Sequence, residues 1–285
     1  MPGAVVVTGA STGIGRAITL QLARDGFRVF AGVRKLTDAE ALRSESPGII
    51  PLILDVTDAE QLAAAVAEVE AAVGDEGLQG LVNNAGVSGG APTEFVPLDE
   101  LRAMFDVNVF GVVATTQAFL PLLRRGAPGR IVVIGSIGGR MAVPFLAGYA
   151  MSKAAVSALC DSLRGELRPW RIEVSLVEPG AIRTPIWEKG LRGVDEQMER
   201  WPEQAVELYG EVIPALRRTT EKTAARALPP ENVAKVVEHA LTASRPRTRY
   251  LVGTEARMQA IVRRIPDRPR DALVARTIGL PKQTQ

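Results

Sequence analysis

Short apolar runs alternate with longer amphipathic segments along most of the chain. Runs rich in valine, isoleucine and leucine lie at 4–9, 28–33, 49–54, 78–84, 130–136, 171–177 and 249–253. Alternation of this kind is typical of βαβ units and predicts a parallel sheet. Because the runs are almost wholly apolar and do not alternate with polar residues, we expect helices on both faces of the sheet.

These seven runs predict an α/β fold with a doubly wound open sheet, since a closed (β/α)₈ barrel needs an eighth strand. The whole chain, 1–285, is then a single domain. Two regions depart from the alternation. Residues 185–228 form a long helical insertion, which predicts a lid over a substrate site. From about residue 254 an arginine- and proline-rich extension follows, either a docked amphipathic helix or a basic surface segment.

The composition is that of a soluble globular protein, with 46% apolar residues, 23% charged residues and a net charge of +2. It implies no nucleic-acid partner. One cysteine, Cys160, and one histidine, His239, leave neither an internal disulfide nor a His/Cys zinc site, so we expect no metal. The amino terminus does not resemble a secretory signal. The apolar run 110–123 is interrupted by polar residues and Pro121, so the prediction is a cytoplasmic protein without an integral membrane segment.

A glycine-rich turn follows the first strand run, in "VVVTGASTGIGRAITLQLARDG". Gly9, Gly13 and Gly15 stand between an apolar strand and a segment of helical period. Glycine permits positive φ and close approach of the backbone, and the helix amino terminus attracts a pyrophosphate. The turn lacks the G-K-[ST] ending of a nucleotide-triphosphate P-loop, so it favours a dinucleotide site. An ordinary strand-to-helix turn is the alternative.

The second strand run ends "RVFAGVRK", where a dinucleotide-binding chain selects its adenosine ribose. An acid here would bind the 2′-hydroxyl of NAD, but this chain has Val33, followed by Arg34 and Lys35. Arg34 can fork onto a 2′-phosphate, so we predict NADP(H) in preference to NAD(H). Alternatively, the two basic residues face solvent and are neutralised by Asp38 and Glu40.

A tyrosine and a lysine, Tyr149 and Lys153, are four residues apart within "AGYAMSKAAVSALC" and share one face of a predicted helix. Alone, such a pair is usually a ring packed against a lysine stem. A nearby ammonium also stabilises a phenolate and lowers the tyrosine pKa towards neutrality, which makes the phenol usable as a general acid or base.

A serine hydrolase is a rival interpretation. "GVSGG", residues 86–90, matches the G-x-S-x-G nucleophile elbow, with Ser88 as nucleophile and His239 as base. The elbow must run from a strand directly into a helix. Here "APTEFVP" follows, which predicts a loop, and His239 lies in a plain amphipathic helix.

Six strings occur in order: "TGASTGIG", "LDVTD", "NNAG", "GSIGG", "YAMSK" and "EPGAIRTP". Together they resemble the single-domain short-chain dehydrogenase/reductase family over roughly residues 4–184. The ending "LPPENVAKVVEHALTASRPRTRYLVG" is most similar to the steroid and retinol dehydrogenase branch. The resemblance implies a Rossmann fold whose cofactor and substrate meet at the carboxyl edge of the sheet.

The resemblance also implies which residues hold the cofactor. Asn83 has a structural alternative, joining neighbouring strands, and Thr184 could instead cap the lid helix. The implied cofactor-binding residues are Gly9, Ser11, Thr12, Gly13, Ile14, Gly15, Arg34, Lys35, Asp55, Val56, Asn83, Ala85, Gly86, Tyr149, Lys153, Pro179, Gly180, Ile182 and Thr184.

The family's catalytic quartet falls on Asn108, Ser136, Tyr149 and Lys153. Tyr149 would exchange the proton, and Ser136 would hydrogen-bond the substrate oxygen as its charge grows. Lys153 would tune Tyr149 and hold the nicotinamide ribose. Asn108 would anchor a water that relays protons to Lys153, or is simply a satisfied core amide. A chain that binds NADP without catalysis, as a sensor, is the remaining alternative, although both Tyr149 and Lys153 are present.

The expected substrate is a hydrophobic alcohol or carbonyl compound, steroid-like or retinoid-like, because apolar residues surround the catalytic strings. Ser136, Ile137, Val143, Phe145, Tyr149 and Trp187 would line its site. The resemblance further implies a homodimer or homotetramer, paired through helices near 97–124 and 149–168. The arginines from 263 onward are expected to be solvated, with contact to acidic lipid headgroups as the alternative.

Overall fold

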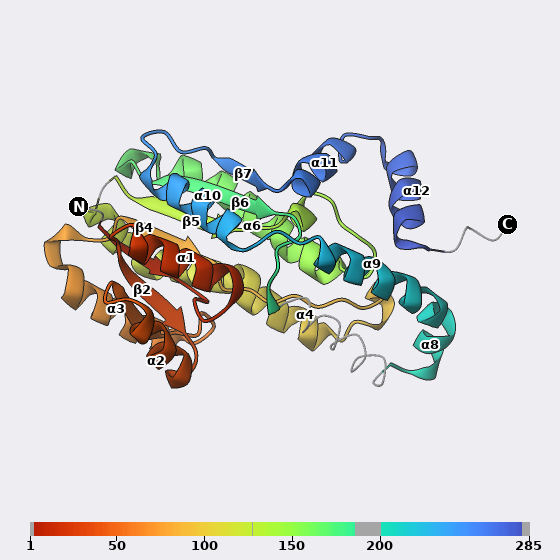
Figure 1. The fold of residues 1–285 in the computed structure, drawn as a ribbon, viewed down its shortest axis with the longest axis horizontal. Helices are drawn as coiled ribbons and strands as arrows, with labels where there is room; N and C mark the ends of the chain where they lie inside the picture. The colour runs from red at the N-terminus through yellow and green to blue at the C-terminus, as the bar shows by residue number, and fades with distance from the viewer. Residues whose placement is uncertain (1–2, 127, 186–200, 281–285) are drawn as a thin grey trace.

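The computed structural model describes residues 3–126, 128–185 and 201–280, and confirms the predicted sheet (Figure 1). All seven strands are parallel, in the order β3-β2-β1-β4-β5-β6-β7. The strands are β1 (Ala4–Val7), β2 (Arg28–Val33), β3 (Ile49–Ile53), β4 (Gly80–Asn83), β5 (Arg130–Ile134), β6 (Glu173–Pro179) and β7 (Arg249–Val252).

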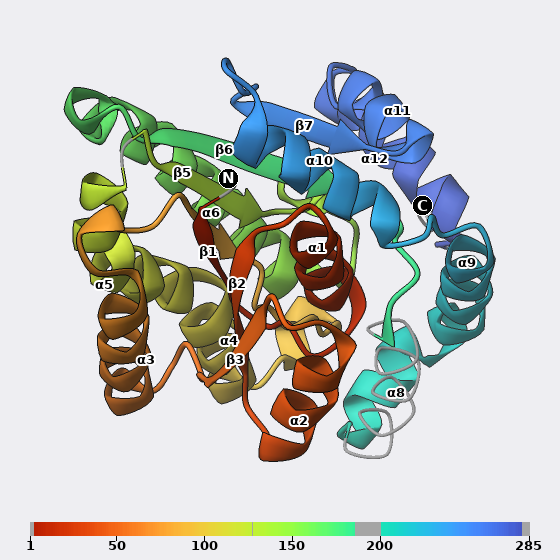
Figure 2. The same ribbon diagram turned by 60° about the vertical axis from the view of Figure 1, so that its left-hand side comes forward.

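Helices cover both faces of this sheet (Figure 2). The longer helices are α1 (Gly13–Arg24), α2 (Leu36–Glu45), α3 (Ala59–Val73), α4 (Leu98–Phe105), α5 (Gly111–Arg125), α6 (Ala147–Glu166), α8 (Glu203–Tyr209), α9 (Ile213–Ala225), α10 (Glu231–Thr242), α11 (Thr254–Val262) and α12 (Asp267–Ile278). A π-helical segment, η3 (Asp106–Phe110), joins α4 to α5. The short 3₁₀ segments are η1 (Gly74–Glu76), η2 (Thr93–Phe95), η4 (Ile137–Gly139), η5 (Arg168–Trp170) and η6 (Gly210–Val212).

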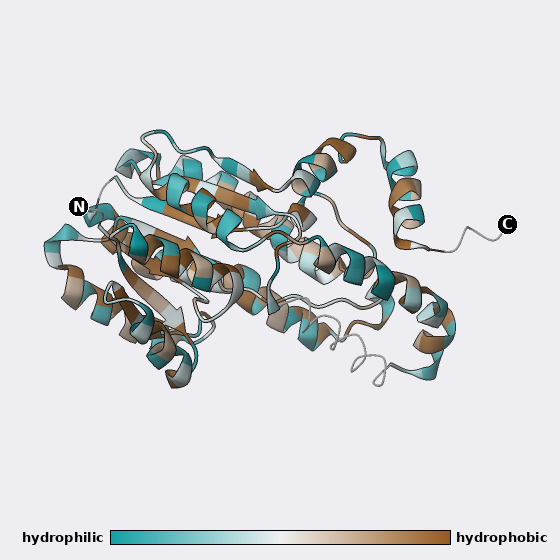
Figure 3. Ribbon diagram, in the orientation of Figure 1, coloured by the Kyte–Doolittle hydropathy of each residue, from teal (hydrophilic) through white to brown (hydrophobic). Residues whose placement is uncertain are grey.

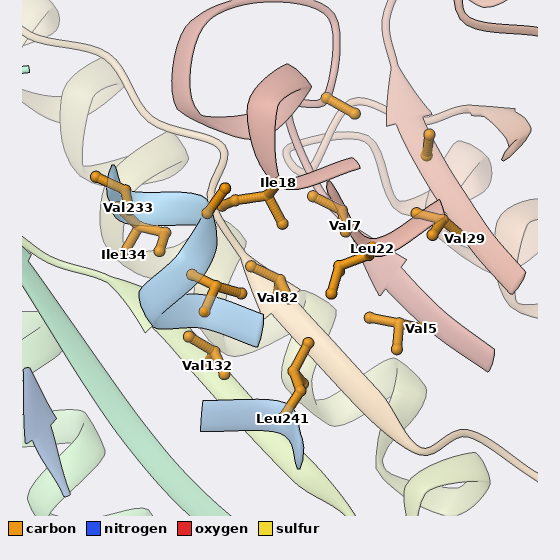
Figure 4. Close-up of a cluster of buried hydrophobic side chains, with 14 of the residues drawn as sticks. Val5, Val7, Ile18, Leu22, Val29, Val82, Val132, Ile134, Val233 and Leu241 are labelled. Atoms are coloured by element: carbon orange, nitrogen blue, oxygen red, sulfur yellow. The ribbon is translucent and has the colours of Figure 1, made fainter. Parts of the chain in front are cut away.

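Successive residues of β1 point into two different cores, which explains its continuous apolar sequence. Val5 and Val7 pack with Ile18 and Leu22 of α1 and with residues of α10 (Figure 4). Val6 belongs to the opposite core, where it lies between its sheet partners Phe30 and Leu81 and under α3, α5 and α6. Apolar colour accordingly concentrates on the strands and on the inner faces of the helices (Figure 3).

Strand β1 lies between β2 and β4. The sheet grows in one direction from β1 to β3 and in the other direction from β4 to β7, so the strand order reverses between β1 and β4. Chain segments that leave these two strands diverge to opposite faces, which opens a crevice at the carboxyl ends of the strands. The loops after β1, β4, β5 and β6 meet at this edge. The strings singled out in the sequence therefore come together in space.

The predicted insertion is helical where it is described: α8, η6 and α9 lie beyond the end of the sheet (Figure 1). The C-terminal extension forms α11 and α12, and its arginines at 263, 264 and 268 are exposed, so the extension is helical and also basic at the surface. Ile278 is only 5% exposed. A Cβ placed on Gly279 would lie 2.8 Å from the Cβ of Ala215 in α9, so α12 packs directly on the insertion.

The helix Leu98–Arg125 is longer than the apolar run considered in the sequence. By length and composition it could cross a membrane, although core helices of soluble proteins pass the same test. The prediction that the chain has no integral membrane segment considered only residues 110–123, which are about half of this helix. In this fold Phe119 and Leu122 of the helix are buried against the sheet.

Candidate active site

The glycine turn after β1 has the backbone that the sequence predicts. Gly9 and Gly13 have φ of +65° and +57°. A Cβ on Gly15 would lie 2.1 Å from the carbonyl oxygen of Gly9, so a side chain there cannot be accommodated without moving the backbone. Thr12, at the N-cap of α1, makes no side-chain capping bond. The turn thus presents helix N–H groups and a close-packed backbone, which fit the pyrophosphate of a dinucleotide.

Asn84 holds this turn in place. Its Nδ2 donates to the carbonyl oxygens of Thr8 at 2.9 Å and Gly9 at 3.0 Å. The hydroxyl of Thr8 in turn accepts from the backbone N–H groups of Asn84 and Ala85, each at 3.0 Å. The loops after β1 and β4 are therefore joined from both sides. The family resemblance implied that residues 83–86, the "NNAG" string, line the adenosine side, but not that Asn84 fixes the glycine turn.

The side chain of Asn83 makes a structural contact within the fold. Its side chain is buried and its Nδ2 donates to the Thr116 hydroxyl of α5 at 3.0 Å. The hydrogen bond joins strand β4 to a helix, whereas the sequence alternative was a link between two strands. The side chain of Asn83 thus makes a structural contact under α5, and a cofactor contact of this residue stays a prediction.

We expect Asn84→Ala to weaken binding of a dinucleotide about tenfold, since the carbonyls of Thr8 and Gly9 lose their donor and the turn is no longer fixed. Fluorescence titration with NADPH measures the change. Asn232→Ala is the matched control: Asn232 is exposed and bonds only a local carbonyl, that of Pro229. Unchanged affinity in Asn84→Ala would show that the turn keeps its form without the side chain.

Arg34 stands at the adenosine end with a side chain that is 70% exposed. Its Nη1 lies 3.9 Å from Asp55, so Asp55, and not Asp38 or Glu40, is its acidic neighbour in the described chain. Partial burial acts to raise the pKa of Asp55, but hydrogen bonds from Thr57 and the charge of Arg34 outweigh it and hold this pKa below its usual value. The guanidinium keeps its access to solvent.

The neighbouring adenosine-side residues differ in exposure. Lys35 is exposed at the N-cap of α2. Val56 is buried against Gly111, where a Cβ would come within 2.6 Å of the valine side chain. In the glycine turn, Ser11 and Ile14 are half-buried and Thr12 is exposed.

Ser136, Tyr149 and Lys153 converge at the carboxyl end of β5. The Ser136 hydroxyl accepts from the Gly138 N–H at 3.1 Å and is hydrogen-bonded to the phenol of Tyr149. The Lys153 ammonium lies 5.8 Å from the centroid of the Tyr149 ring and donates to the Ile134 carbonyl at 3.1 Å. A Cβ on Gly139 would lie 2.7 Å from the Lys153 carbonyl carbon, so this glycine lets η4 press against α6.

Burial governs the pKa values of this group. It raises the pKa of Tyr149 above its usual value, against the opposing hydrogen bond of Ser136. Burial also lowers the pKa of Lys153 to about 8. The sequence led us to expect that Lys153 would lower the tyrosine pKa. In the protein alone desolvation is the larger effect, so Tyr149 is a protonated phenol at neutral pH.

Asn108 lies in the π-helical segment η3 and is 1% exposed. Its Oδ1 accepts from the Val87 N–H at 2.8 Å, and its Nδ2 donates to the Val87 carbonyl at 2.9 Å and to the Ser152 hydroxyl at 3.0 Å. The amide is therefore satisfied, which supports the core-amide interpretation for the side chain. A Cβ on Gly86 would lie 3.2 Å from Asn108 Oδ1 and 3.5 Å from Lys153 Nζ, so Gly86 lies between them.

The segment after β6 faces the glycine turn. Pro179 ends β6, and the N–H of Gly180 donates to Val252 at 3.1 Å. Ile182 pairs with Leu228 in an isolated bridge, which ties this segment to the end of the insertion. A Cβ on Gly13 would come within 3.0 Å of Thr184, so Thr184 lies against the pyrophosphate turn.

An aromatic cluster joins α8 to η2 and to the loop that precedes α6. Tyr209 of α8 makes edge-to-face contacts with Phe95 and Phe145, each at 6.0 Å between centroids, and its hydroxyl donates to Glu94 at 2.9 Å. Phe145 has φ of +72°, a rare backbone for a bulky residue. Of the other predicted lining residues, Ile137 is buried, Val143 is half-buried and Trp187 lies outside the described residues.

The hydrolase arrangement does not form. Ser88 is exposed in the loop between β4 and η2, so it does not stand on a strand-to-helix turn. His239 lies on α10, and its Nδ1 is 3.0 Å from the Tyr250 hydroxyl. The two residues share no contact that would activate a nucleophile.

Residues 3–193 match the family model described as short chain dehydrogenase. This chain belongs to the short-chain dehydrogenase family. Among its relatives, "NADPH-dependent 3-dehydrocapnine reductase" of Ornithobacterium rhinotracheale is 38% identical over 94% of each chain. Retinol dehydrogenase 5 of Mus musculus is 36% identical over 98% of this chain and 90% of its own. 17-beta-hydroxysteroid dehydrogenase type 6 of Bos taurus is 39% identical over 88% and 81%.

Solved short-chain dehydrogenases share the fold. One from Streptomyces avermitilis is 28% identical, with a TM-score of 0.76 over 96% of this chain and 94% of its own. Another, from Burkholderia cenocepacia in complex with NADP, is 28% identical, with a TM-score of 0.72 over 97% of each. The chain is thus an oxidoreductase of the steroid/retinol dehydrogenase type, a family that acts on alcohols and carbonyl compounds with nicotinamide cofactors.

Proposed function

We propose that this short-chain dehydrogenase uses NADP(H) to interconvert a hydrophobic alcohol and its ketone or aldehyde, with Tyr149 as general acid and base. The observation that carries the proposal is that the side chains of Ser136, Tyr149 and Lys153 lie together at the edge of the sheet that also holds the glycine turn. The bound nicotinamide dinucleotide supplies or accepts the hydride. Every other requirement falls on side chains of the protein.

Each of the three residues has a separate task. The Tyr149 phenol, protonated at neutral pH, donates its proton to the substrate oxygen during reduction. Ser136, whose oxygen already accepts from Gly138, can turn its O–H from the Tyr149 phenol to the same substrate oxygen and stabilise its developing charge. Lys153, with a pKa of about 8, can return a proton to Tyr149 and hold ribose hydroxyls.

A lipophilic substrate is favoured by the surroundings of the site. Ile137 follows Ser136 directly, and Phe145, just before the Tyr149 helix, contacts Tyr209, which also contacts Phe95. Two relatives are named for a retinol and a hydroxysteroid, both lipophilic alcohols. We include steroid-like and retinoid-like compounds in the proposal.

A homodimer or homotetramer is also part of the proposal. The helices α4–α5 and α6 carry large apolar side chains at the surface, with Phe110 61% exposed and Met151 46% exposed. Pairing of these faces between two copies of the chain would remove both side chains from water.

Turnover of a panel of hydrophobic and small polar carbonyls with NADPH and NADH tests the proposal. We expect NADPH to be preferred, and Arg34→Ala to lower kcat/KM for NADPH about tenfold or more while NADH changes little, because only the 2′-phosphate needs the guanidinium. Arg43→Ala, an exposed arginine of α2, is the control. Equal rates with both cofactors in the wild type would refute the role of Arg34, and activity confined to small polar carbonyls would refute the lipophilic site.

A further inference from the structure

A cavity of about 410 Å³ lies between the loop that follows η4 and the C-terminal helices. One wall is formed by residues 140–144, which connect the Ser136 turn to the Tyr149 helix. The opposite wall is formed by Arg263, just after α11, and by residues of α12 that include Arg270. An adjoining hollow shares Arg140 and Arg263 and extends to Ser157 of α6.

Three guanidinium groups line this cavity, and their charges are neutralised to different degrees. Arg140 is held by the carboxylate of Glu178, with its Nε 2.6 Å from Oε1. Arg270 lies between Asp267 at 2.7 Å and Asp271 at 3.3 Å, and Asp271 also lines the cavity. Arg263 forms no ion pair with any residue of the described chain.

Two observations show that donors of these guanidinium groups remain without partners. Arg263 is exposed and its charge is unpaired within the ranges described. The Nη1 of Arg270 is buried and has no hydrogen-bond partner among the same residues. A buried donor without an acceptor costs free energy that a bound anion would recover.

The remaining wall is apolar. Met141, Ala142, Val143 and Pro144 lie on the loop side, and Val274 lies on α12. Arginine forks combined with aliphatic surface suit a molecule that has both a charged end and a hydrocarbon part. A fully solvated inorganic ion would leave the apolar wall unused.

We propose that this cavity binds an anionic group, a carboxylate, sulfonate or phosphate, that is attached to an aliphatic chain, with Arg263 as its principal charge partner. The group belongs either to the substrate or to a separate ligand. The substrate case rests on the proposed oxidoreductase function, whereas the binding itself does not.

An occupant of the cavity would contact the loop 140–144, which lies between Ser136 and Tyr149 in the chain. Residues 140–144 follow directly on η4, which is pressed against α6 at Lys153 through Gly139. Arg140 reaches across to Glu178, next to Pro179 of the cofactor turn. A ligand that rests on the 140–144 loop therefore touches the segment that connects Ser136 to Tyr149.

Isothermal titration of the full chain with octanesulfonate tests the binding, with octanol as the uncharged probe. We expect saturable binding of octanesulfonate that weakens about tenfold in Arg263→Gln. Arg264→Gln is the matched control, because Arg264 is the adjacent exposed arginine and lines neither hollow. Octanol should bind wild type and Arg263→Gln alike. Equal octanesulfonate affinity in wild type and Arg263→Gln would overturn the proposal, even in a fully active enzyme.

Kinetics with NADPH identify the source of the anion. The probes are a long-chain ω-oxo carboxylate and its methyl ester. If the substrate supplies the anion, Arg263→Gln lowers kcat/KM about tenfold for the acid only. If a separate ligand supplies it, octanesulfonate alters kcat for the ester without raising its KM. Absence of turnover with any carbonyl would refute the proposed function and leave the titration to decide the binding site.

Discussion

Replacement of Tyr149 by phenylalanine should lower kcat by about 10²- to 10⁴-fold while NADPH still binds. The substitution removes one oxygen from a side chain that packs against η4 and hydrogen-bonds Ser136. Ring packing is retained, so the fold and the cofactor turn should survive. What is lost is the proton that the substrate oxygen needs as the carbonyl is reduced.

Steady-state kinetics and NADPH fluorescence titration measure the two properties separately. Tyr250→Phe is the matched control, since its hydroxyl bonds His239 and the Arg247 N–H, away from the catalytic group. Full activity of Tyr149→Phe would refute the assignment of the proton to this residue. A wild-type chain that binds NADPH without oxidising it with any carbonyl would instead be the non-catalytic sensor.

Loss of the charge on Glu178 should lower the free energy of unfolding by about 3–5 kcal/mol, a large share of a typical domain's stability. Glu178 is 1% exposed and accepts from Arg140 Nε at 2.6 Å and Nη2 at 2.5 Å. Arg249 lies 3.5 Å from the same carboxylate and also binds Ser157 and Asp161 of α6. Glu178→Gln would leave two arginines facing a neutral amide.

Urea denaturation followed by circular dichroism measures this loss. Glu70→Gln is the control, because the Glu70–Arg125 pair has a similar distance of 2.6 Å but its side chains are 52% and 39% exposed. That change should cost less than about 1 kcal/mol. If the two substitutions cost the same, the buried network does not stabilise the fold. Replacing Arg140 and Glu178 together by Met and Leu should restore much of the loss, since no unpaired charge then remains between them.

The sheet and the glycine turn could be predicted because their signals are local. The residues of β1 are apolar on both sides, and Gly9 and Gly13 adopt the positive φ that their position in the turn requires. Ser136, Tyr149 and Lys153 were found for a different reason: helical spacing and the order of the family strings place them together. The C-terminal extension left two possibilities open, because its docking depends on distant contacts such as the one between Gly279 and Ala215.

The errors concern partners that are distant in sequence. Nothing local tells which of two adjacent asparagines points to the glycine turn, since this depends on Thr116 under β4 and on the carbonyls of Thr8 and Gly9. The burial that raises the pKa of Tyr149 in the protein alone could not be predicted, because the sequence reveals the neighbouring lysine but not the extent of burial. Glu178 was read only as part of "EPG", while its importance comes from Arg140 and Arg249.

The π-helical segment at 106–110 sets the phase between the two halves of one long helix. A π turn contains one residue more than the regular winding, so α4 and α5 are rotated relative to each other by the angle of one residue. This offset allows Asn108 to reach Val87 while Thr116 and Phe119 still face the sheet. Deletion of one residue here would restore a regular helix. Either Asn108 would then lose its two hydrogen bonds to the backbone of Val87, or the buried side chains of α5 would no longer face the sheet. The length of this helix is thus as constrained as its composition.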